Sequence, residues 1–216
     1  MHQALIVDDH VIATAVHCVY TGLEFRDLSI RITDENNNLI KTVSPKYIHV
    51  PKEAIYNTNS IRGTHDYALL YVEEDLSEYG AFQLGVATDE YIDNHGSVVV
   101  SGFPGDLPEN YTGQSGDIRF KASGNFYRSS VSPYNNYRCF YDADAVGGNS
   151  GGPVYVEEGF KVGDQWYKYK TVVAIHSGGC ASFSLNYNYF DPEYNSGVTI
   201  TPDILNFYYS NSYLTE

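Results

Sequence analysis

The sequence predicts an all-β protein, and three observations support that fold class. Tyrosine and phenylalanine are abundant, with 21 Tyr and 10 Phe in 216 residues, and Val, Ile and Thr are frequent. Apolar runs are short and end at glycine, proline, asparagine or aspartate, which favour turns. No window keeps the apolar spacing of an amphipathic helix or a heptad repeat. Many short strands of this kind are typical of β-barrels or a β-sandwich.

Predicted strands occupy most of the first half of the chain. They cover Ala4–Val7, Val11–Ala15, Leu28–Thr33, Leu39–Val43, Tyr47–Val50 and Tyr67–Val72. The first two form a hairpin around Asp8-Asp9-His10, and the last is a continuous apolar run typical of a buried strand. The irregular stretch from Glu73 to Thr88 is predicted to join two domains, residues 1–88 and residues 89–216.

The second half repeats the pattern and ends in a short helix. Strands are predicted over Ser97–Phe103, Asp117–Ala122, Phe140–Asp142, Pro153–Val156, Thr171–His176 and Gly197–Thr201. A separate hairpin over Phe160–Lys170 turns at Gly163-Asp164. Pro202 is suited to the first turn of a C-terminal helix, Asp203–Tyr209.

Composition excludes several classes of partner. The net charge of −14 argues against nucleic acid and against anionic lipid, because both require basic patches. No apolar stretch is long enough to span a membrane, and the N-terminus lacks the pattern of a signal peptide. We expect neither a cofactor nor a metal site, since no CxxC or HxxxH-type pair occurs. Three cysteines, Cys18, Cys139 and Cys180, leave at least one unpaired, and a Cys139–Cys180 bridge is possible.

The stretch AVGGNSGGPVY, from Ala145 to Tyr155, places Ser150 among four glycines. One interpretation is a flexible hairpin loop. The other is a nucleophilic serine surrounded by backbone N–H groups that bind an oxyanion, which requires a histidine base and a carboxylate. His17 closes a predicted strand and Asp66 precedes another, and each alone is compatible with a structural role. All three in this order favour catalysis.

These blocks resemble a known family. The stretches IATAVHC, HDYALL and GGNSGGPVY are similar to the catalytic blocks of chymotrypsin-fold serine endopeptidases. The resemblance implies two antiparallel β-barrels of the six-stranded type and a short C-terminal helix. It implies that Ser150 is the nucleophile, His17 the general acid/base and Asp66 the group that orients His17. The oxyanion hole would consist of the N–H groups of Gly148 and Ser150.

Further motifs resemble the secreted bacterial glutamyl endopeptidases. They are VSGFPGD, VVAIHSGG and SGVTITPDILNFY. The resemblance implies that His176 binds an acidic P1 side chain, the substrate residue before the cleaved bond, and that Ser177 and Gly178 pair with the substrate backbone. Ala145 departs from the family, which usually has a hydroxyl residue there. Asp144 offers the alternative of a Lys or Arg preference.

Other interpretations stay open at this stage. In this fold further strands usually precede the histidine strand, so the first barrel is expected to be incomplete at its N-terminus. Accounts of this include a misassigned start, a diverged domain and a poorly active relative. A protease of the high-temperature-requirement group and a non-catalytic homologue acting as a binding module are competing functions. The family resemblance implies polypeptide substrates and an extracellular location, and we expect a monomer.

Overall fold

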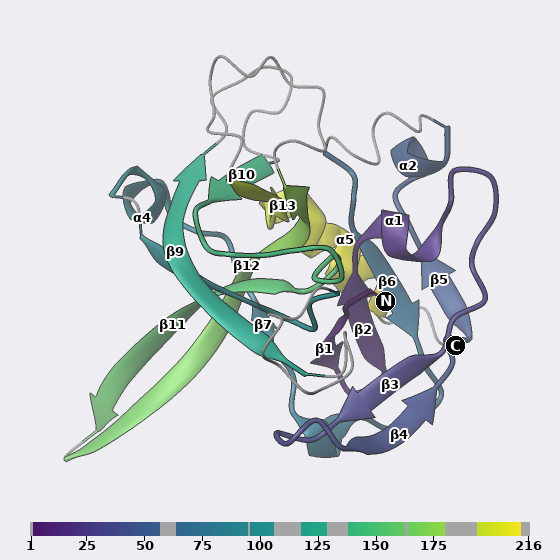
Figure 1. The fold of residues 1–216 in the computed structure, drawn as a ribbon, viewed down its shortest axis with the longest axis horizontal. Coiled ribbons are helices and arrows are strands. Elements are labelled where there is room, and N and C mark those ends of the chain that lie inside the picture. Colours follow the sequence, from purple (N-terminus) through teal and green to yellow (C-terminus); the bar gives the residue numbers. More distant parts are fainter. Residues whose placement is uncertain are drawn as a thin grey trace.

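The computed structural model describes most of the chain, with gaps in several loops. The described residues are 2–56, 64–94, 96–105, 118–128, 138–162, 164–179 and 194–212. Strands dominate and helices are short, which confirms the predicted all-β class (Figure 1). Within the described residues no helix is both long and apolar enough to cross a membrane.

The first half forms two separate sheets. β1 (Leu5–Asp8), β2 (Val11–Thr14), β6 (Ala68–Tyr71) and β5 (Tyr47–His49) pair in that order, all antiparallel. β3 (Ile30–Thr33) and β4 (Leu39–Val43) pair only with each other among the described strands. Hydrogen bonds between the described strands therefore do not join these two sheets. The expectation that the first barrel lacks strands at its N-terminus stays a prediction. A cleft of about 440 Å³ opens beside β1 and α1.

The second half is a closed barrel. Its strands are β8 (Ser97–Gly102), β9 (Phe120–Arg128), β10 (Arg138–Tyr141), β11 (Pro153–Val162), β12 (Gln165–Gly179) and β13 (Asn195–Thr199). They pair in the order β11-β8-β9-β10-β13-β12, and a β11–β12 ladder completes the ring. β7 (Gln83–Leu84) adds a short parallel pairing to β12. This closed six-stranded barrel confirms the predicted fold class for the second half.

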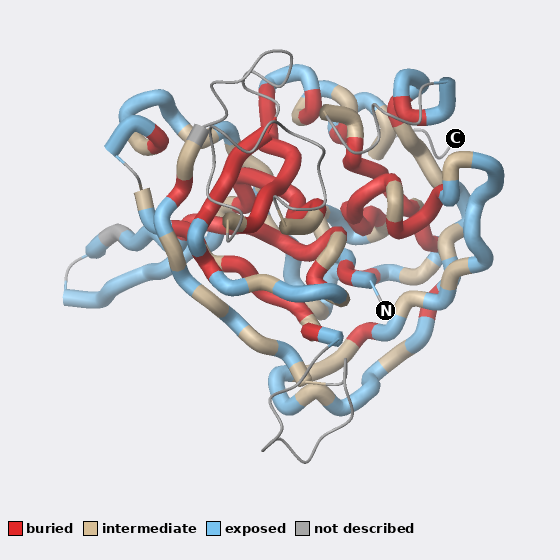
Figure 2. The backbone as a smooth tube through the Cα atoms, turned by 45° about the horizontal axis from the view of Figure 1, so that its top comes forward, coloured by how far each residue is buried: buried red, intermediate tan, exposed pale blue. Residues whose placement is uncertain are grey.

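β11 and β12 are much longer than the sequence suggested. Strands over Pro153–Val156 and Thr171–His176 were expected beside a separate hairpin, but one ladder extends from Pro153↔Ile175 to Val162↔Gln165, with a register shift between Val154 and Tyr155. The inner end is buried in the barrel, while the outer end projects into solvent (Figures 1 and 2). The change from apolar to polar residues therefore marks where the hairpin leaves the barrel, because backbone pairing continues past that point.

Short helices occupy several segments expected to be strand or loop. They are α1 (Val16–Val19), α2 (Lys52–Tyr56), the 3₁₀ turn η1 (Ser77–Tyr79) and α4 (Asp89–Asp93). The prediction that His17 ends a strand is wrong, because β2 ends at Thr14 and His17 lies in α1. The predicted C-terminal helix is confirmed as α5 (Pro202–Ser212), with proline in its first turn.

Two hydrophobic clusters form the core, seen as the red segments in Figure 2. The smaller lies inside the closed barrel and includes Val98 and Phe126. The larger joins the two halves, because it contains Leu69 from β6, Val172 from β12 and Ile204 from α5. The predicted domain boundary after residue 88 stays a prediction.

We expect Ile12→Ala to lower the free energy of unfolding by about 2–5 kcal/mol, because the side chain in the middle of β2 is 1% exposed and its loss leaves a cavity. Ile40→Ala is the matched control, since Ile40 in β4 is 51% exposed and its truncation should change stability by no more than about 0.5 kcal/mol. Urea unfolding followed by circular dichroism measures both. Equal losses would contradict the placement of Ile12 in the core.

Candidate active site

Antiparallel pairing brings His17 and Asp66 together. β2 and β6 are neighbours, and Thr14 at the end of β2 lies opposite Ala68 at the start of β6. The residue shortly after β2 must therefore meet the residue shortly before β6. His17 follows β2 in α1, and Asp66 precedes β6. The strand register thus explains the contact between two residues that lie far apart in the sequence.

The carboxylate of Asp66 accepts three hydrogen bonds. The ring Nδ1 of His17 lies 2.7 Å from Oδ2, and the backbone N–H of His17 donates to Oδ1 at 3.0 Å. The hydroxyl of Ser177, on β12, donates to Oδ2 at 2.5 Å. Asp66 itself is buried. The contact between Ser177 and Asp66 was not predicted, because the sequence suggested only backbone pairing with a substrate for Ser177.

Burial and pairing act in opposite directions on both groups. Burial lowers the pKa of His17, but the charge of Asp66 and its hydrogen bond outweigh burial and raise that pKa above its ordinary value of 6.5. Burial raises the pKa of Asp66, yet the His17 imidazole and the donors around the carboxylate bring the net value below 3.8. Asp66 is therefore ionised at neutral pH, and its charge holds the imidazole in place.

The loop around Ser150 depends on glycine at three of the four positions that the sequence singled out. Gly148 has φ +104° and Gly151 has φ +85°, and a Cβ at either would lie within 3 Å of neighbouring atoms. A Cβ at Gly152 would lie 2.8 Å from the carbonyl oxygen of Ser101. Gly147 differs from these three, because a Cβ there meets nothing within 4 Å and the turn itself therefore does not require glycine at this position.

From Gly148 to Gly151, N–H groups that donate a hydrogen bond within the described structure alternate with N–H groups that donate none. Asn149 N–H donates to the carbonyl of Val146, and Gly151 N–H donates to the carbonyl of His176. The N–H groups of Gly148 and Ser150 donate to no group within the described part of the chain. Two unpartnered donors flanking a single residue are what an oxyanion hole requires.

Gln3 fastens the loop to the first half of the chain. Its backbone N–H donates to the carbonyl of Ser150 at 2.7 Å, and its side-chain amide donates to the carbonyl of Gly148 at 2.9 Å. The carbonyl of Gln3 accepts from the Thr14 hydroxyl at 2.6 Å. On the other side, the N–H of His176 donates to the carbonyl of Gly152. This role of Gln3 was not predicted, because nothing in the sequence marks a single glutamine near the N-terminus as a partner of the loop.

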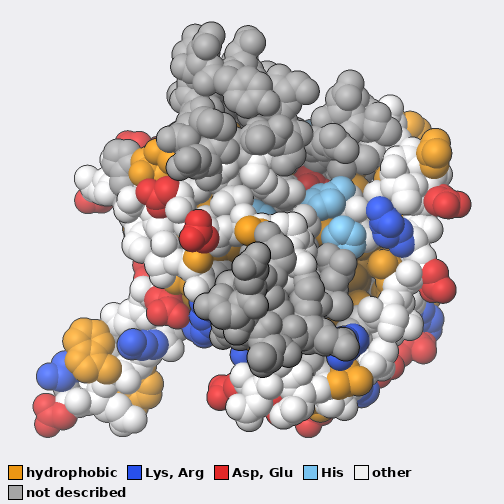
Figure 3. All heavy atoms as spheres, in the orientation of Figure 1, with side chains coloured by type: hydrophobic (Ala, Val, Ile, Leu, Met, Phe, Trp, Pro, Cys, Tyr) orange, Lys and Arg blue, Asp and Glu red, His pale blue; other side chains and the backbone are white. Residues whose placement is uncertain are grey.

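Cys18 lies between the glycine loop and the imidazole. A Cβ built on Gly151 would lie 3.2 Å from Cys18 Sγ, and Sγ lies 3.7 Å from His17 Nε2. The loop that carries Ser150 is therefore adjacent to His17, and histidine side chains reach the surface near the middle of this face (Figure 3). Among the described residues the hydrogen-bond partner of Nε2 is Cys18, and Ser150 and His17 form no hydrogen bond.

The predicted specificity residues lie along one edge of β12 and in the loop before Ser150. His176 is buried, and its Nδ1 lies 2.5 Å from the hydroxyl of Tyr141. Gly178 has φ +149°, next to a register shift in the β12–β13 ladder. Ala145 is half-buried and Asp144 is exposed. Of the two candidate specificity groups, the His176 imidazole is therefore buried and the Asp144 carboxylate is exposed.

The cysteines do not form the bridge that the sequence left possible. Cys18 and Cys139 are buried free thiols. The thiol of Cys139 donates to the carbonyl of Gly197 at 3.6 Å, and burial raises its pKa to about 12. Cys180 lies outside the described residues.

Comparisons with known proteins identify relatives at the level of family and fold. The sequence profile of the family described as "Trypsin-like peptidase domain" matches residues 4–163. Among curated proteins no sequence matches. The fold is similar to that of a Glu endopeptidase solved in complex with MPD, with a TM-score of 0.70, 19% identity and coverage of 98% of this chain and 85% of that chain. It is also similar to the protease Anisep from Arthrobacter nicotinovorans, with a TM-score of 0.65, 16% identity and coverage of 97% and 87%.

We expect Asp66→Asn to lower the pKa of His17 from above 6.5 to below it, because only burial then acts strongly on the imidazole. Titration of the histidine ring signals by nuclear magnetic resonance measures the change. Asp164→Asn on the projecting hairpin is the control and should leave His17 unaffected. An unchanged His17 pKa in Asp66→Asn would show that the carboxylate does not hold the imidazole in solution.

Proposed function

The chain belongs to the family of trypsin-like peptidase domains, and we propose that Ser150, His17 and Asp66 form its catalytic triad. As a member of that family it is a serine protease that acts on polypeptides. One observation carries the assignment: the buried Asp66 carboxylate is paired with the half-buried His17 ring beside a glycine loop, in which the N–H groups of Gly148 and Ser150 have no partner among the described residues. The loop contains a single hydroxyl, that of Ser150.

In the proposed reaction the hydroxyl oxygen of Ser150 attacks the peptide carbonyl, and its proton passes to His17 Nε2. The reaction uses the neutral imidazole, in which Asp66, at 2.7 Å from Nδ1, keeps the single ring proton on Nδ1 and leaves the lone pair on Nε2. Nε2 exchanges its contact with the Cys18 thiol for the Ser150 hydroxyl when substrate binds, since such hydrogen bonds often form fully only in the complex.

The tetrahedral intermediate carries its negative charge beside the N–H groups of Gly148 and Ser150. Because these donors have no internal partner, they are available to the oxyanion without breaking an existing bond. His17 then returns the proton to the leaving amine as the C–N bond breaks, and a water molecule hydrolyses the acyl group from Ser150 by the same steps in reverse.

We expect Ser150→Ala to reduce peptide hydrolysis by about 10³-fold or more while the far-UV circular dichroism stays that of the wild type. A fluorophosphonate probe should label the wild type and not this variant. Ser123→Ala is the matched control, because Ser123 is an exposed residue of β9 away from the loop. Folded wild-type protein that neither labels nor hydrolyses would support the alternative of a non-catalytic binding module.

We also propose a preference for an acidic residue at P1, bound by His176. Burial lowers the pKa of His176 to about 3, so its ring is neutral at physiological pH. We assign the Tyr141 hydroxyl as donor to Nδ1, which leaves the ring proton on Nε2 as a donor for a carboxylate. The buried charge of Arg138 also contributes to lowering the pKa of His176, and that charge favours a substrate anion over a cation.

The alternative is a Lys or Arg preference through Asp144. Asp144 is exposed in the described structure, whereas His176 is buried. An exposed carboxylate attracts a substrate cation only weakly in water and salt. The buried imidazole and the guanidinium beside it therefore support the acidic preference.

Hydrolysis of a peptide library that varies only P1 tests this preference. We expect Glu or Asp to be favoured, and we expect Tyr141→Phe to reduce kcat/KM for acidic P1 by about tenfold relative to other residues, because the tautomer of His176 is then no longer fixed. Tyr209→Phe, at an exposed position on α5, is the control. A preference for Lys or Arg would support Asp144 instead.

A further inference from the structure

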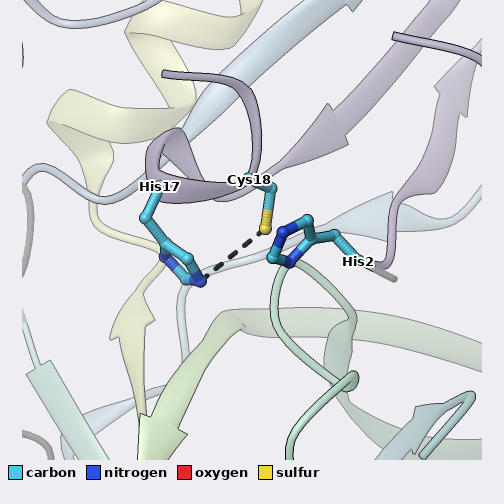
Figure 4. Close-up of side chains that lie close together, drawn as sticks. All are labelled: His2, His17 and Cys18. Atoms are coloured by element: carbon cyan, nitrogen blue, oxygen red, sulfur yellow. Dashed lines mark hydrogen bonds between the residues drawn. The ribbon is translucent and has the colours of Figure 1, made fainter. Parts of the chain in front are cut away.

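Three side chains that commonly ligate metals gather next to the proposed triad. They are His2, from the segment before β1, and His17 and Cys18, both from α1. One ligand atom of each lies within 4.8 Å of the others, and Figure 4 shows the three side chains converging. The two imidazole rings are 5.9 Å apart at an interplanar angle of 86°. The sequence did not predict this group, because His2 is remote from the other two and no metal-binding spacing is present.

We propose that His2, His17 and Cys18 form a zinc site whose occupation inhibits the protease, an inference that rests on His17 being the general base. Two imidazole nitrogens and a thiolate are ligands that zinc prefers, and three protein ligands leave its fourth position for water. Ordinary zinc bond lengths in a tetrahedral site place nitrogen and sulfur ligands about 3.6 Å apart. Cys18 Sγ and His17 Nε2 are 3.7 Å apart in the structure, so this edge of the site already has the required length.

The hydrogen bond to Asp66 prepares His17 for a metal as well as for a proton. Nδ1 is engaged by the carboxylate at 2.7 Å, so Nε2 is the nitrogen that faces Cys18. A carboxylate behind a histidine ligand fixes the ring and increases its basicity, as in many zinc sites. The His2 ring stands nearly at right angles to this imidazole, which allows its nitrogens to approach from a different direction.

Access and local charge are compatible with a hydrated cation. His2 is exposed, and both His2 and Cys18 line the cleft of about 440 Å³ in the first half. Arg26 on the same cleft opposes a cation, whereas Asp27 on the cleft and Asp66 behind His17 favour it. The overall charge of −14 raises the local concentration of cations at the surface.

Zinc at this site would stop catalysis by a direct chemical route. The lone pair of His17 Nε2 that accepts the Ser150 proton would instead bind the metal. The thiol proton of Cys18 would pass to solvent as its sulfur binds, and no oxidant or reductant is involved. A chelator such as EDTA should remove the metal and restore activity.

Zinc inhibition of the wild type is compared with that of His2→Ala and Cys18→Ala, each measured relative to its own activity in EDTA. We expect wild-type inhibition at micromolar zinc and a half-inhibitory concentration about tenfold higher or more in either variant. His49→Ala, which removes a histidine on β5 outside the cluster, is the matched control. Magnesium should not inhibit, because it prefers oxygen ligands.

Cobalt(II) absorption gives a second readout that needs no catalytic activity. We expect one Co²⁺ per chain with a thiolate-to-metal charge-transfer band, present in Ser150→Ala and lost in Cys18→Ala. Metal binding with this band in a protein that hydrolyses nothing would overturn the proposed function alone. Three results in an active protease would overturn the zinc site alone. They are equal zinc inhibition of wild type, His2→Ala and Cys18→Ala, equal inhibition by magnesium, and cobalt titration of the wild type without the thiolate band.

Discussion

The buried carboxylate of Asp66 is the constraint on which the arrangement of the site depends. An ionised carboxylate removed from water costs several kcal/mol unless its oxygens are paired. Here one oxygen accepts from the backbone of His17, and the other from the His17 ring and the Ser177 hydroxyl. These donors lie on α1 and β12, one in each half of the chain. The hydrogen bonds that Asp66 needs in the core therefore fix the imidazole and connect the two halves of the chain.

The glycine loop shows a complementary arrangement, in which carbonyls are paired and amides are left available. Gln3 satisfies the carbonyls of Gly148 and Ser150, while the N–H groups of the same two residues stay unused. If the carbonyls lacked partners, the peptide units could rotate to satisfy them and the amides would lose their direction. In the proposed reaction, Gln3 would thus hold the peptide orientation that an oxyanion needs before substrate binds, and such preorganisation makes hydrogen-bond donors effective.

Features that depend on local sequence pattern or on a recognisable motif could be predicted from the sequence. Features that depend on contacts between distant residues could not. The all-β class and many of the strands followed from alternation and turn residues, whereas the barrel architecture and the proposed roles of His17, Asp66 and Ser150 came from the resemblance of three motifs in order. The contacts of Ser177 with Asp66 and of Gln3 with Gly148 join residues 111 and 145 positions apart, and a single polar residue has no periodic signature. The four glycines around Ser150 cannot be told apart in the sequence, because only φ and local space distinguish a glycine that the turn requires from one that it tolerates.

In the two proposals, the His17 imidazole binds either the proton of Ser150 or a zinc ion, and Cys18 lies where it would help to bind the zinc ion. Asp66 raises the electron density of the His17 ring and directs its lone pair at Nε2 away from the carboxylate. The serine proton and a zinc ion would both bind to that lone pair. The hydrogen bond to Asp66 that makes His17 a stronger base therefore also makes it a stronger metal ligand. The two bound species differ in the other groups that they require. Proton transfer requires only Ser150 beside His17, whereas zinc binding also requires the Cys18 thiol, 3.7 Å from His17 Nε2, and His2. In the proposed reaction His17 is the general base, and the proposed zinc site would use the same imidazole together with Cys18 and His2.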